Sequence, residues 1–595
     1  MQPSLPPGSE KPYDVATTPA SGPAVFGEKG RAVDEAIAKR RSEPASLVSL
    51  LVELYRLLGP LAPPAIDYVA LRLRLPQEAI ASLANAYKVA DPNVSVPRLG
   101  LCINGPCAAR GGAEVERILK EKGVPFEPLR CQGSCDLGPI ACYHHGAPLA
   151  ISAARARSLA KADPGDWEDL LAVEKPVHAF KTEPRAAFTN IFAKGSHQLA
   201  TARRHGVYAP LEAAVREPPE KVLAAIEDAG LLGAGGFGEK TADRWRKARQ
   251  ASGSPRYLLI DAAEREPGSF KDRILLERDP HLVLSGAALA AYAVGATEAF
   301  LCLRLEYELA QERLRAAIEE AFRAGYLGER VAGSDSFSLR LDIRLVAPPY
   351  FAGEAGALVD ALEGKPPRSA PAPVALFGQP TLVHNVETLA RLPSIVGRGG
   401  AWWRSLGSGG GLLVCCLSGD LKRPGAYEVA RGTPIRDLID GLGGGPAQGK
   451  LVTGAQIGGS SGAYLPASLL DLPLDDAALA PHGAFVGIGS VMAFTEKTCV
   501  LDLARREAAF FARESTPGCP ACRLLTGVAQ KIDETGNLDE LRASVEEIEV
   551  AARAGGCALS LRAVVPIASL LRHFSAAAAD HAEGRCSCAL KKKPR

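Results

Sequence analysis

Apolar residues recur every three or four positions from about residue 31 to residue 90, a spacing typical of amphipathic helices. The segments VDEAIAKRRSEPASLVSLLVELYRLLG and IDYVALRLRLPQEAIASLANAY therefore predict two or three helices. A short α/β unit follows, in which RLGLCING predicts a strand and a loop and AEVERILKEKG predicts a helix. The next segment, FEPLRCQGSCDLGPIACYHHGAPLAIS, predicts strands interrupted by a loop that carries cysteines.

A larger α/β region extends from about residue 200 to residue 400. Its strand candidates are YLLIDAAE, EAFLCLRL and LDIRLVAPPY, which alternate with helical patterns and glycine-rich loops. The run LVLSGAALAAYAVGAT, residues 282–297, is shorter than the roughly 20 apolar residues of a membrane-spanning helix. Its alanine and glycine content predicts a closely packed interior helix, so we expect no transmembrane segment.

The rest of the chain contains a β-rich part and then helices. Residues 411–490 predict a small module in which the turn at RPGAYEV joins two strands and TPIRDLIDGL forms a helix. The fold class is thus α/β and multidomain. The expected divisions are a disordered leader at 1–30, a helical lead and α/β unit at 31–160, a linker at 161–195, an α/β domain at 196–405, a β-rich module at 406–490, a helical domain at 491–575 and a tail at 576–595.

Composition narrows the possible functions. The chain has 595 residues, of which 47% are hydrophobic, and its 69 basic and 67 acidic residues nearly cancel. This balance gives no electrostatic support for binding nucleic acid. The N-terminus lacks the basic and apolar pattern of an export signal, and the 14 cysteines, several in tight clusters, favour metal or redox chemistry over disulfides. We therefore expect a cytoplasmic protein.

Two cysteine pairs in the first α/β unit form the strongest local signal. Four residues separate Cys102 from Cys107, and three separate Cys131 from Cys135. Each pair can hold one iron of a [2Fe-2S] cluster, and the flanking Gly and Pro residues are typical of loops that expose sulfur. A zinc site with four cysteines is the main alternative, although zinc loops more often have two residues between ligands. Four unrelated core cysteines are the least favoured interpretation.

The stretch GLLGAGGFGEKTADRW, residues 230–245, places glycines such as Gly233, Gly235 and Gly236 before a predicted helix. Backbone N–H groups in such a loop bind phosphate together with the helix N-terminus, and the missing side chains let a flat ring approach the chain. On this stretch alone, a flexible turn is also compatible with the sequence.

Three motifs follow in order: YLLIDAAEREPGSFKDRILLERDPHLVLSG, PPYFAGEAGALVDALEG and LFGQPTLVHNVETLARLP. With the glycine loop, they resemble the FMN- and NADH-binding flavoprotein subunit of respiratory complex I and the diaphorase subunits of NAD-reducing hydrogenases and formate dehydrogenases. The resemblance covers roughly residues 190–570. The first cysteine unit resembles the thioredoxin-like [2Fe-2S] subunit of complex I, so the chain resembles a fusion of the two subunits. The resemblance implies a thioredoxin-like first unit, a β-grasp module and a C-terminal helical bundle.

The resemblance also implies which positions contact FMN or the nicotinamide nucleotide. These are Gly233, Gly235, Gly236, Phe237, Asp261, Glu264, Gly353, Glu354, His384 and Asn385. The chain departs from the family pattern at Ala263, Ala355 and His384, where the family carries a carboxylate, a carboxylate and an amide, and at Asp261, which is an acid where the family carries an amide. FMN, held chiefly by backbone and glycine, is less sensitive to these changes than NADH.

A second cysteine pair, Cys519 and Cys522, has the two-residue spacing common in iron–sulfur and zinc sites. In the flavoprotein family that the chain resembles, two further cysteines complete a [4Fe-4S] cluster. Here Cys557 stands at one of these positions and Thr516 at the other, so three of four expected ligands are present. The cluster then persists with an oxygen or external ligand, recruits a sulfur from Cys586 or Cys588 in the tail, or is absent.

Two functional hypotheses follow. The first, which we favour, is a diaphorase-type NADH dehydrogenase: hydride passes between NADH or NADPH and FMN, and iron–sulfur clusters carry single electrons to partner redox subunits of a larger complex, with this chain at most peripheral to a membrane. The second is a non-catalytic electron relay or assembly component that keeps the fold and the [2Fe-2S] centre but does not bind nucleotide.

Overall fold

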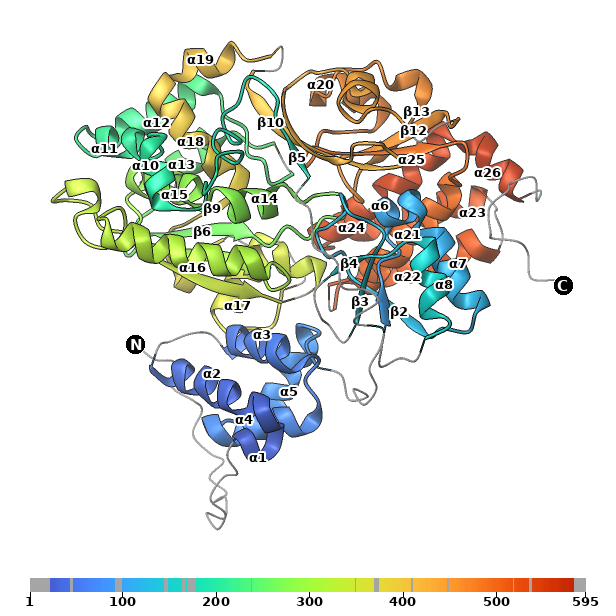
Figure 1. Cartoon of the computed structure of the whole chain (residues 1–595), viewed down its shortest axis with the longest axis horizontal. Helices are drawn as coiled ribbons and strands as arrows, with labels where there is room; N and C mark the ends of the chain where they lie inside the picture. The colour runs from blue at the N-terminus through green and yellow to red at the C-terminus, as the bar shows by residue number, and fades with distance from the viewer. Residues whose placement is uncertain are drawn as a thin grey trace.

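The computed structural model describes residues 22–42, 47–90, 99–143, 148–162, 167, 178–236, 238–347, 349–368, 374–407, 410–446, 449–516, 518–534 and 538–582. The predictions for residues 1–21, Phe237, Cys586 and Cys588 lie outside these residues. In Figure 1 the N-terminal helices lie at the bottom beneath α17 (Ala355–Leu362), and the first cysteine unit lies beside the C-terminal helices.

The N-terminal helices share an apolar core with the central domain. They are α1 (Gly22–Phe26), α2 (Gly30–Ser42), α3 (Leu47–Leu58), α4 (Pro63–Leu73) and α5 (Gln77–Ala86). The amphipathic patterns are confirmed, and the shared core includes Phe351 and Leu358. The expected disordered leader is wrong for residues 22–30, which are helical, because the Gly22 N–H donates to Asp34 and Phe26 packs against Tyr68.

The first α/β unit contains a four-stranded sheet in the order β2, β1, β3, β4. Its elements are β1 (Leu99–Leu101), α6 (Gly105–Cys107), α7 (Ala113–Glu121), β2 (Phe126–Pro128), β3 (Ile140–Tyr143), β4 (Leu149–Ala150) and α8 (Ala153–Leu159). Strands β1 and β2 are parallel and the other pairs are antiparallel. Cys102 follows β1 directly and Cys107 ends α6, whereas Cys131 and Cys135 lie in the loop between β2 and β3.

The segment expected to be a linker at 161–195 is bound to the β-rich module over its described C-terminal part. Strand β5 (Ala179–Phe180) pairs in parallel with β11 (Gly425–Ala430), and Phe180 stacks on Tyr427 with 4.8 Å between ring centroids. The buried carboxylate of Glu428 accepts three backbone N–H groups, from residues 186–188, at 2.8–3.0 Å. This buried anchor explains why these residues are not a free linker.

The central domain is built on four parallel strands in the order β8, β7, β6, β9. Besides α17, its elements are α10 (Leu199–Arg204), α11 (Ala209–Ala214), α12 (Glu220–Ala229), α13 (Thr241–Gln250), β6 (Tyr257–Ala262), α14 (Lys271–Arg278), α15 (Pro280–Val294), β7 (Glu298–Arg304), α16 (Glu308–Arg323), β8 (Arg340–Val346), β9 (Thr381–Asn385), α18 (Val386–Arg398) and α19 (Gly400–Arg404). The three strand candidates from the sequence are confirmed as β6, β7 and β8.

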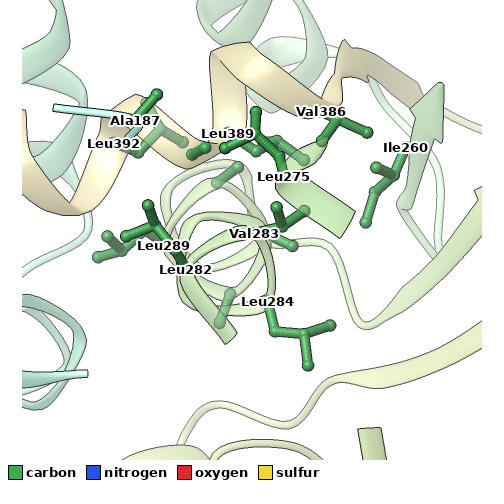
Figure 2. Packing of buried hydrophobic residues seen from close by; sticks show 14 of the residues in the cluster. Ala187, Ile260, Leu275, Leu282, Val283, Leu284, Leu289, Val386, Leu389 and Leu392 are labelled. Atoms are coloured by element: carbon green, nitrogen blue, oxygen red, sulfur yellow. The ribbon is translucent and has the colours of Figure 1, made fainter. Parts of the chain in front are cut away.

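Helix α15 is the interior helix expected from its alanine and glycine content, and every one of its residues is buried. Figure 2 shows Val283 of this helix on the side of Leu275, with Leu282 and Leu289 on the other side, and these residues belong to one apolar cluster with Ile260 and side chains of α18. A Cβ at Gly286 would lie 2.0 Å from a backbone oxygen of α18, so glycine is required where the two helices meet. No helix within the described ranges has the length and apolar character needed to cross a membrane.

The β-rich module forms a six-stranded sheet in the order β13, β12, β14, β10, β11, β5. Its own elements are β10 (Leu412–Gly419), β11, β12 (Val452–Ile457), β13 (Ala463–Pro466), α20 (Asp476–Leu479) and β14 (Ser490–Thr495). The predicted hairpin is confirmed, because β10 and β11 are antiparallel neighbours. Ile488, in the loop before β14, lines the cavity described below.

The C-terminal helices are α21 (Val500–Arg513), α22 (Pro520–Glu534), α23 (Leu538–Arg553), α24 (Ala558–Ala563), α25 (Val565–His573) and α26 (Ser575–Ala582). They enclose a core that contains Cys519, Cys522 and Cys557. The prediction of a tail is wrong for residues 576–582, because they belong to α26 and Ala578 is fully buried in this core.

Helix α14 joins the central domain to the first cysteine unit. The guanidinium of Arg273 donates to the backbone oxygen of Gly133 at 2.9 Å and to both carboxylate oxygens of Asp136 at 3.0 and 3.2 Å. Arg273 and Asp136 are 4% and 0% exposed, so water screens this ion pair little. The cysteine loop is therefore held on the central domain by a buried, bidentate charge pair.

Replacing Arg273 with Ala is expected to loosen the loop of residues 131–136, because it removes the guanidinium partner of the buried Asp136 carboxylate at a cost of about 3–5 kcal/mol. Hydrogen exchange of the loop amides, followed by mass spectrometry, should accelerate strongly. Arg323→Ala, which breaks an exposed ion pair with Glu319, serves as the control and should leave the loop unchanged. Unaltered exchange in Arg273→Ala would contradict the docking role.

Candidate functional site

A cavity of about 160 Å³ lies at the carboxyl ends of β6 and β9, where α/β proteins commonly bind ligands. It gathers residues that are far apart in the sequence. The predicted residues that line it are Gly233, Gly235, Asp261, Glu264, Gly353, Glu354, His384 and Asn385. Gly236 does not line the cavity but turns the glycine loop with a φ of +99°.

The glycine loop is fixed beside the N-terminus of α18. The N–H of Ala234 donates to the Thr388 hydroxyl at 2.9 Å, and the N–H of Gly233 donates to the Glu239 backbone oxygen at 2.8 Å. A Cβ added to Gly235 would have its nearest neighbour 3.6 Å away, at Asn385. The loop therefore leaves an open backbone surface that a flat or phosphorylated ligand can approach.

Asp261 lies near the end of β6, and its half-buried side chain lines the cavity. One oxygen accepts the Ala263 N–H at 3.0 Å. Burial, assisted by the nearby Glu354 carboxyl, raises the pKa of Asp261 to about 6, although the Ala263 N–H and Lys271 act to lower it. Asp261 therefore changes charge near neutral pH, directly beside the cavity.

Glu264 is occupied by protein donors. Its carboxylate accepts the Ser269 hydroxyl at 2.7 Å, the Asp272 and Arg273 N–H groups at 2.9 Å, and the Tyr307 hydroxyl at 2.7 Å. Its backbone has a φ of +39°, which is strained for a residue with a side chain. Glu264, predicted as a cofactor contact, therefore lines the cavity mainly as the anchor of the α14 N-terminus.

A buried lysine supplies positive charge beside the cavity. Lys271 is 1% exposed, and its Nζ lies 2.8 Å from Asp272, 3.1 Å from the Asn385 oxygen and 3.2 Å from Glu387. Burial alone would lower the pKa of Lys271, but the neighbouring carboxylates outweigh burial and raise it. Lys271 is therefore charged, and Asn385 serves to orient it.

His384 is a buried structural residue in the cavity wall. Its Nε2 accepts the indole N–H of Trp245. Burial, assisted by Arg244, lowers the pKa of His384 to about 3, so the imidazole is neutral. His384 therefore shapes the cavity wall and holds Trp245 in place, and it has no acidic proton to donate at neutral pH.

Several charged residues that the sequence did not single out also line the cavity, among them Glu266, Lys271 and Arg562. Arg562 lies 3.6 Å from Glu354, and Tyr350 donates to Glu266. Burial raises the pKa of both glutamates. Glu266 and Lys271 stand within the EREPGSFK motif, whereas nothing in the local sequence marks Arg562, which comes from the C-terminal helices.

The first four cysteines are arranged as two pairs. The Cys131 and Cys135 sulfurs are 3.7 Å apart, and the Cys107 thiol interacts with Cys102. Among the described residues, no three of these sulfurs lie within 4.8 Å of one another. Two thiolates on one tetrahedral iron are about 3.8 Å apart when the bonds are about 2.3 Å long, so the pairing fits a two-iron centre.

The first cysteine set also touches the cavity wall. The N–H of Gly268 donates to the Cys135 sulfur at 3.3 Å, and Gly268 follows Glu266 in the loop that lines the cavity. Arg304 donates to the backbone oxygens of Cys131 and Glu264. One loop of the central domain thus connects the cavity to the sulfurs.

The second cysteine set is a compact group. The sulfurs of Cys519, Cys522 and Cys557 all lie within 4.8 Å of one another, and those of Cys522 and Cys557 are 3.3 Å apart. The Thr516 side chain hydrogen-bonds with the Cys557 thiol and helps to lower its pKa, after the larger effect of Cys522. Thr516 therefore occupies the position beside the three sulfurs that the sequence predicted.

Acidification should destabilise the protein through His384, because its folded pKa lies below the ordinary 6.5 and protons bind the unfolded chain first. The stability contributed by neutral, buried His384 is nearly complete at pH 7.5 and is lower by about 2 kcal/mol at pH 5. His384→Gln, which keeps an acceptor for Trp245, should reduce this decline in urea titrations at the two pH values. Exposed His205→Gln is the control; an equal decline in His384→Gln would refute the assignment.

Comparisons with known proteins agree with this geometry. The family model described as "Nuo51 FMN-binding domain" matches residues 226–394, and the model described as "SLBB domain" matches residues 414–462. The Nuo51 match contains all of the cavity's predicted residues, from Gly233 to Asn385.

Relatives and a solved structure extend the similarity over most of the chain. The F 2 subunit of NADH-quinone oxidoreductase from Rhizobium meliloti is 37% identical over 415 residues, which cover 67% of this chain and 97% of the relative. The F subunit of the same enzyme from Streptomyces coelicolor is 36% identical over 405 residues, 66% of this chain and 89% of the relative. The NAD+-reducing [NiFe]-hydrogenase in the H2-reduced state is 29% identical with a TM-score of 0.73, covering 90% of this chain and 93% of that chain. This chain therefore belongs to the family of NADH-quinone oxidoreductase F subunits.

Proposed function

We propose that this chain is an electron-input module that oxidises NADH or NADPH with bound FMN and passes single electrons to partner subunits. The observation that carries the proposal is the cavity, which joins the glycine loop, Asp261, Lys271 and Asn385 inside the matched FMN-binding domain. When bound, FMN supplies the exchange between a two-electron hydride and single electrons.

The residues of the cavity fit FMN chemically. Gly233 and Gly235 leave backbone exposed for a flat ring, and the Lys271 ammonium beside them is neutralised by Asp272 and Glu387. Asp261 can take up or release a proton near neutral pH beside the ring position. Glu264 and His384 hold α14 and Trp245 in place, so the cavity keeps its shape through turnover.

The two pairs of the first cysteine unit support a [2Fe-2S] cluster in a thioredoxin-like domain as the one-electron acceptor. Their sulfurs are buried, and the Gly268 N–H bond to Cys135 gives a direct contact with the cavity loop. A hydrogen bond to a cluster sulfur stabilises the reduced state, because reduction adds negative charge. This contact therefore favours electron flow from the cavity to the first unit.

The partners follow from the relatives' names. Those relatives are subunits of NADH-quinone oxidoreductases, and the structural neighbour reduces NAD+ in a hydrogenase. We propose partner redox subunits that receive or supply electrons, at the periphery of a membrane complex where such a complex exists. A cytoplasmic location stays a prediction.

One observation favours a second candidate, a relay that no longer binds nucleotide. The cavity volume of about 160 Å³ is below the roughly 300–1,000 Å³ typical of ligand sites. Glu264 is already occupied by four protein donors. A full flavin together with a nicotinamide needs more space than this cavity has.

Gly235→Val separates the two candidates. The Cβ at this position has ordinary space, so the fold should persist, but the added methyl groups fill the open loop surface and should abolish FMN binding. Anaerobically purified wild type should contain FMN that bleaches with NADH or NADPH, while Gly235→Val should contain little FMN and keep the [2Fe-2S] EPR signal.

Gly441→Val, at an exposed glycine with no atom near its Cβ position, is the matched control and should retain FMN. If the wild type contains the [2Fe-2S] centre but no flavin, or a flavin that neither NADH nor NADPH reduces, the dehydrogenase hypothesis is wrong and the relay hypothesis is supported.

A further inference from the structure

We propose that Cys519, Cys522 and Cys557 bind a single zinc ion, in place of the [4Fe-4S] cluster expected from the family. The proposal concerns a different site from the FMN cavity and does not depend on nucleotide binding. It rests on the spacing of the three sulfurs, on the residue at the fourth corner and on the contrast with the first cysteine set.

The spacing matches one tetrahedral ion. Zinc–sulfur bonds of about 2.3 Å place tetrahedral thiolates about 3.8 Å apart. The three sulfurs all lie within 4.8 Å of one another, and those of Cys522 and Cys557 are 3.3 Å apart, so the observed distances lie on both sides of the tetrahedral value. In a cubane each thiolate bonds a different iron at a different corner, so its sulfurs are splayed apart more widely. The second cysteine set is too compact for that arrangement.

The first cysteine set serves as an internal reference. Its sulfurs form close pairs, and no three described ones gather within 4.8 Å, as expected for two metal centres. The chain therefore holds apart the sulfurs that serve a cluster and brings together the sulfurs of the second set. The compactness of Cys519, Cys522 and Cys557 is specific to that site.

The fourth corner is an oxygen. Thr516 is 6% exposed, and its side chain hydrogen-bonds with the Cys557 thiol. Zinc accepts mixed sulfur and oxygen ligands, whereas a neutral hydroxyl is a poor ligand for a cluster iron. We assign the fourth ligand to a water held by the Thr516 hydroxyl, because water is a ligand that zinc accepts beside protein sulfurs.

The local fold suits a structural zinc. Cys522 lies in the first turn of α22, and Cys557 immediately precedes α24. The N–H of Cys557 donates to the Cys519 sulfur at 3.4 Å, and the group lies inside the C-terminal apolar core. One ion would thus fasten the starts of two helices to each other, and it would carry no electron because zinc has no redox chemistry.

The test is the metal content of the full-length protein, purified anaerobically from cells supplied with iron and zinc. We expect about one zinc and about two irons per chain, with only a [2Fe-2S] signal in EPR and Mössbauer spectra. Zinc X-ray absorption should show three sulfur neighbours at about 2.3 Å and one oxygen at about 2.0 Å.

Three variants sharpen the assignment. Cys519→Ser should lose the zinc and keep the two irons, and Thr516→Val should release zinc to a chelator about 10–100-fold faster. Cys499→Ser is the control and should keep both metals, because Cys499 caps α21 outside the group. About six irons in the wild type, a [4Fe-4S] or [3Fe-4S] signal, or zinc that survives Cys519→Ser would overturn the proposal.

Discussion

The carboxylate of Glu264 is the interaction on which the arrangement of this molecule depends. It accepts four hydrogen bonds, two of them from the first N–H groups of α14, while its own backbone stands at a φ of +39°. Such a conformation costs about 1–3 kcal/mol. Hydrogen bonds to a charged acceptor contribute about 1.5–3 kcal/mol each, so four of them outweigh the strain and fix the turn between β6 and α14.

That turn positions two functional side chains at once. Lys271 and Arg273 stand in the first turn of α14: the Lys271 ammonium lies beside the cavity, and the Arg273 guanidinium binds the cysteine loop at Gly133 and Asp136. Tyr307, which also donates to Glu264, packs so closely on Gly133 that a Cβ there would lie 2.2 Å from its hydroxyl. The cavity and the first four cysteines are therefore positioned by the same carboxylate. Any change in Glu264 would disturb both centres together.

Much of the fold could be predicted from local sequence patterns. Strands β6 to β8, the buried α15 and the hairpin of β10 and β11 follow from periodicity and turn residues, because their neighbours in sequence decide their structure. Strand β5 and helix α1 were missed, because each exists through a distant partner: Glu428 for the segment after β5, and Asp34 and Tyr68 for α1. Short elements of this kind have no periodic signal of their own.

The candidate site, too, could be predicted only in part from the sequence. The candidate glycines and cysteines could be identified from the sequence, because clustered glycines and closely spaced cysteines in loops are typical of ligand-binding and metal-binding sites. The sequence could not show that Glu264 is saturated, since its donors Ser269 and Tyr307 are brought to it by the fold. Arg562 was beyond reach for the same reason: its partner Glu354 is about 200 residues away in the chain.

The departures from the family pattern surround the cavity. Ala263 follows β6, His384 lies in β9, Ala355 follows Glu354, and Thr516 lies beside the sulfurs of the C-terminal helices. None of these four residues makes the contact between the cavity loop and the first cysteine set, which the Gly268 N–H makes by donating to the Cys135 sulfur. The loop itself is held by Glu264, which the family pattern shares. The connection from the cavity to the first unit therefore does not depend on what the second cysteine set holds, because it uses neither the substituted positions nor the C-terminal sulfurs.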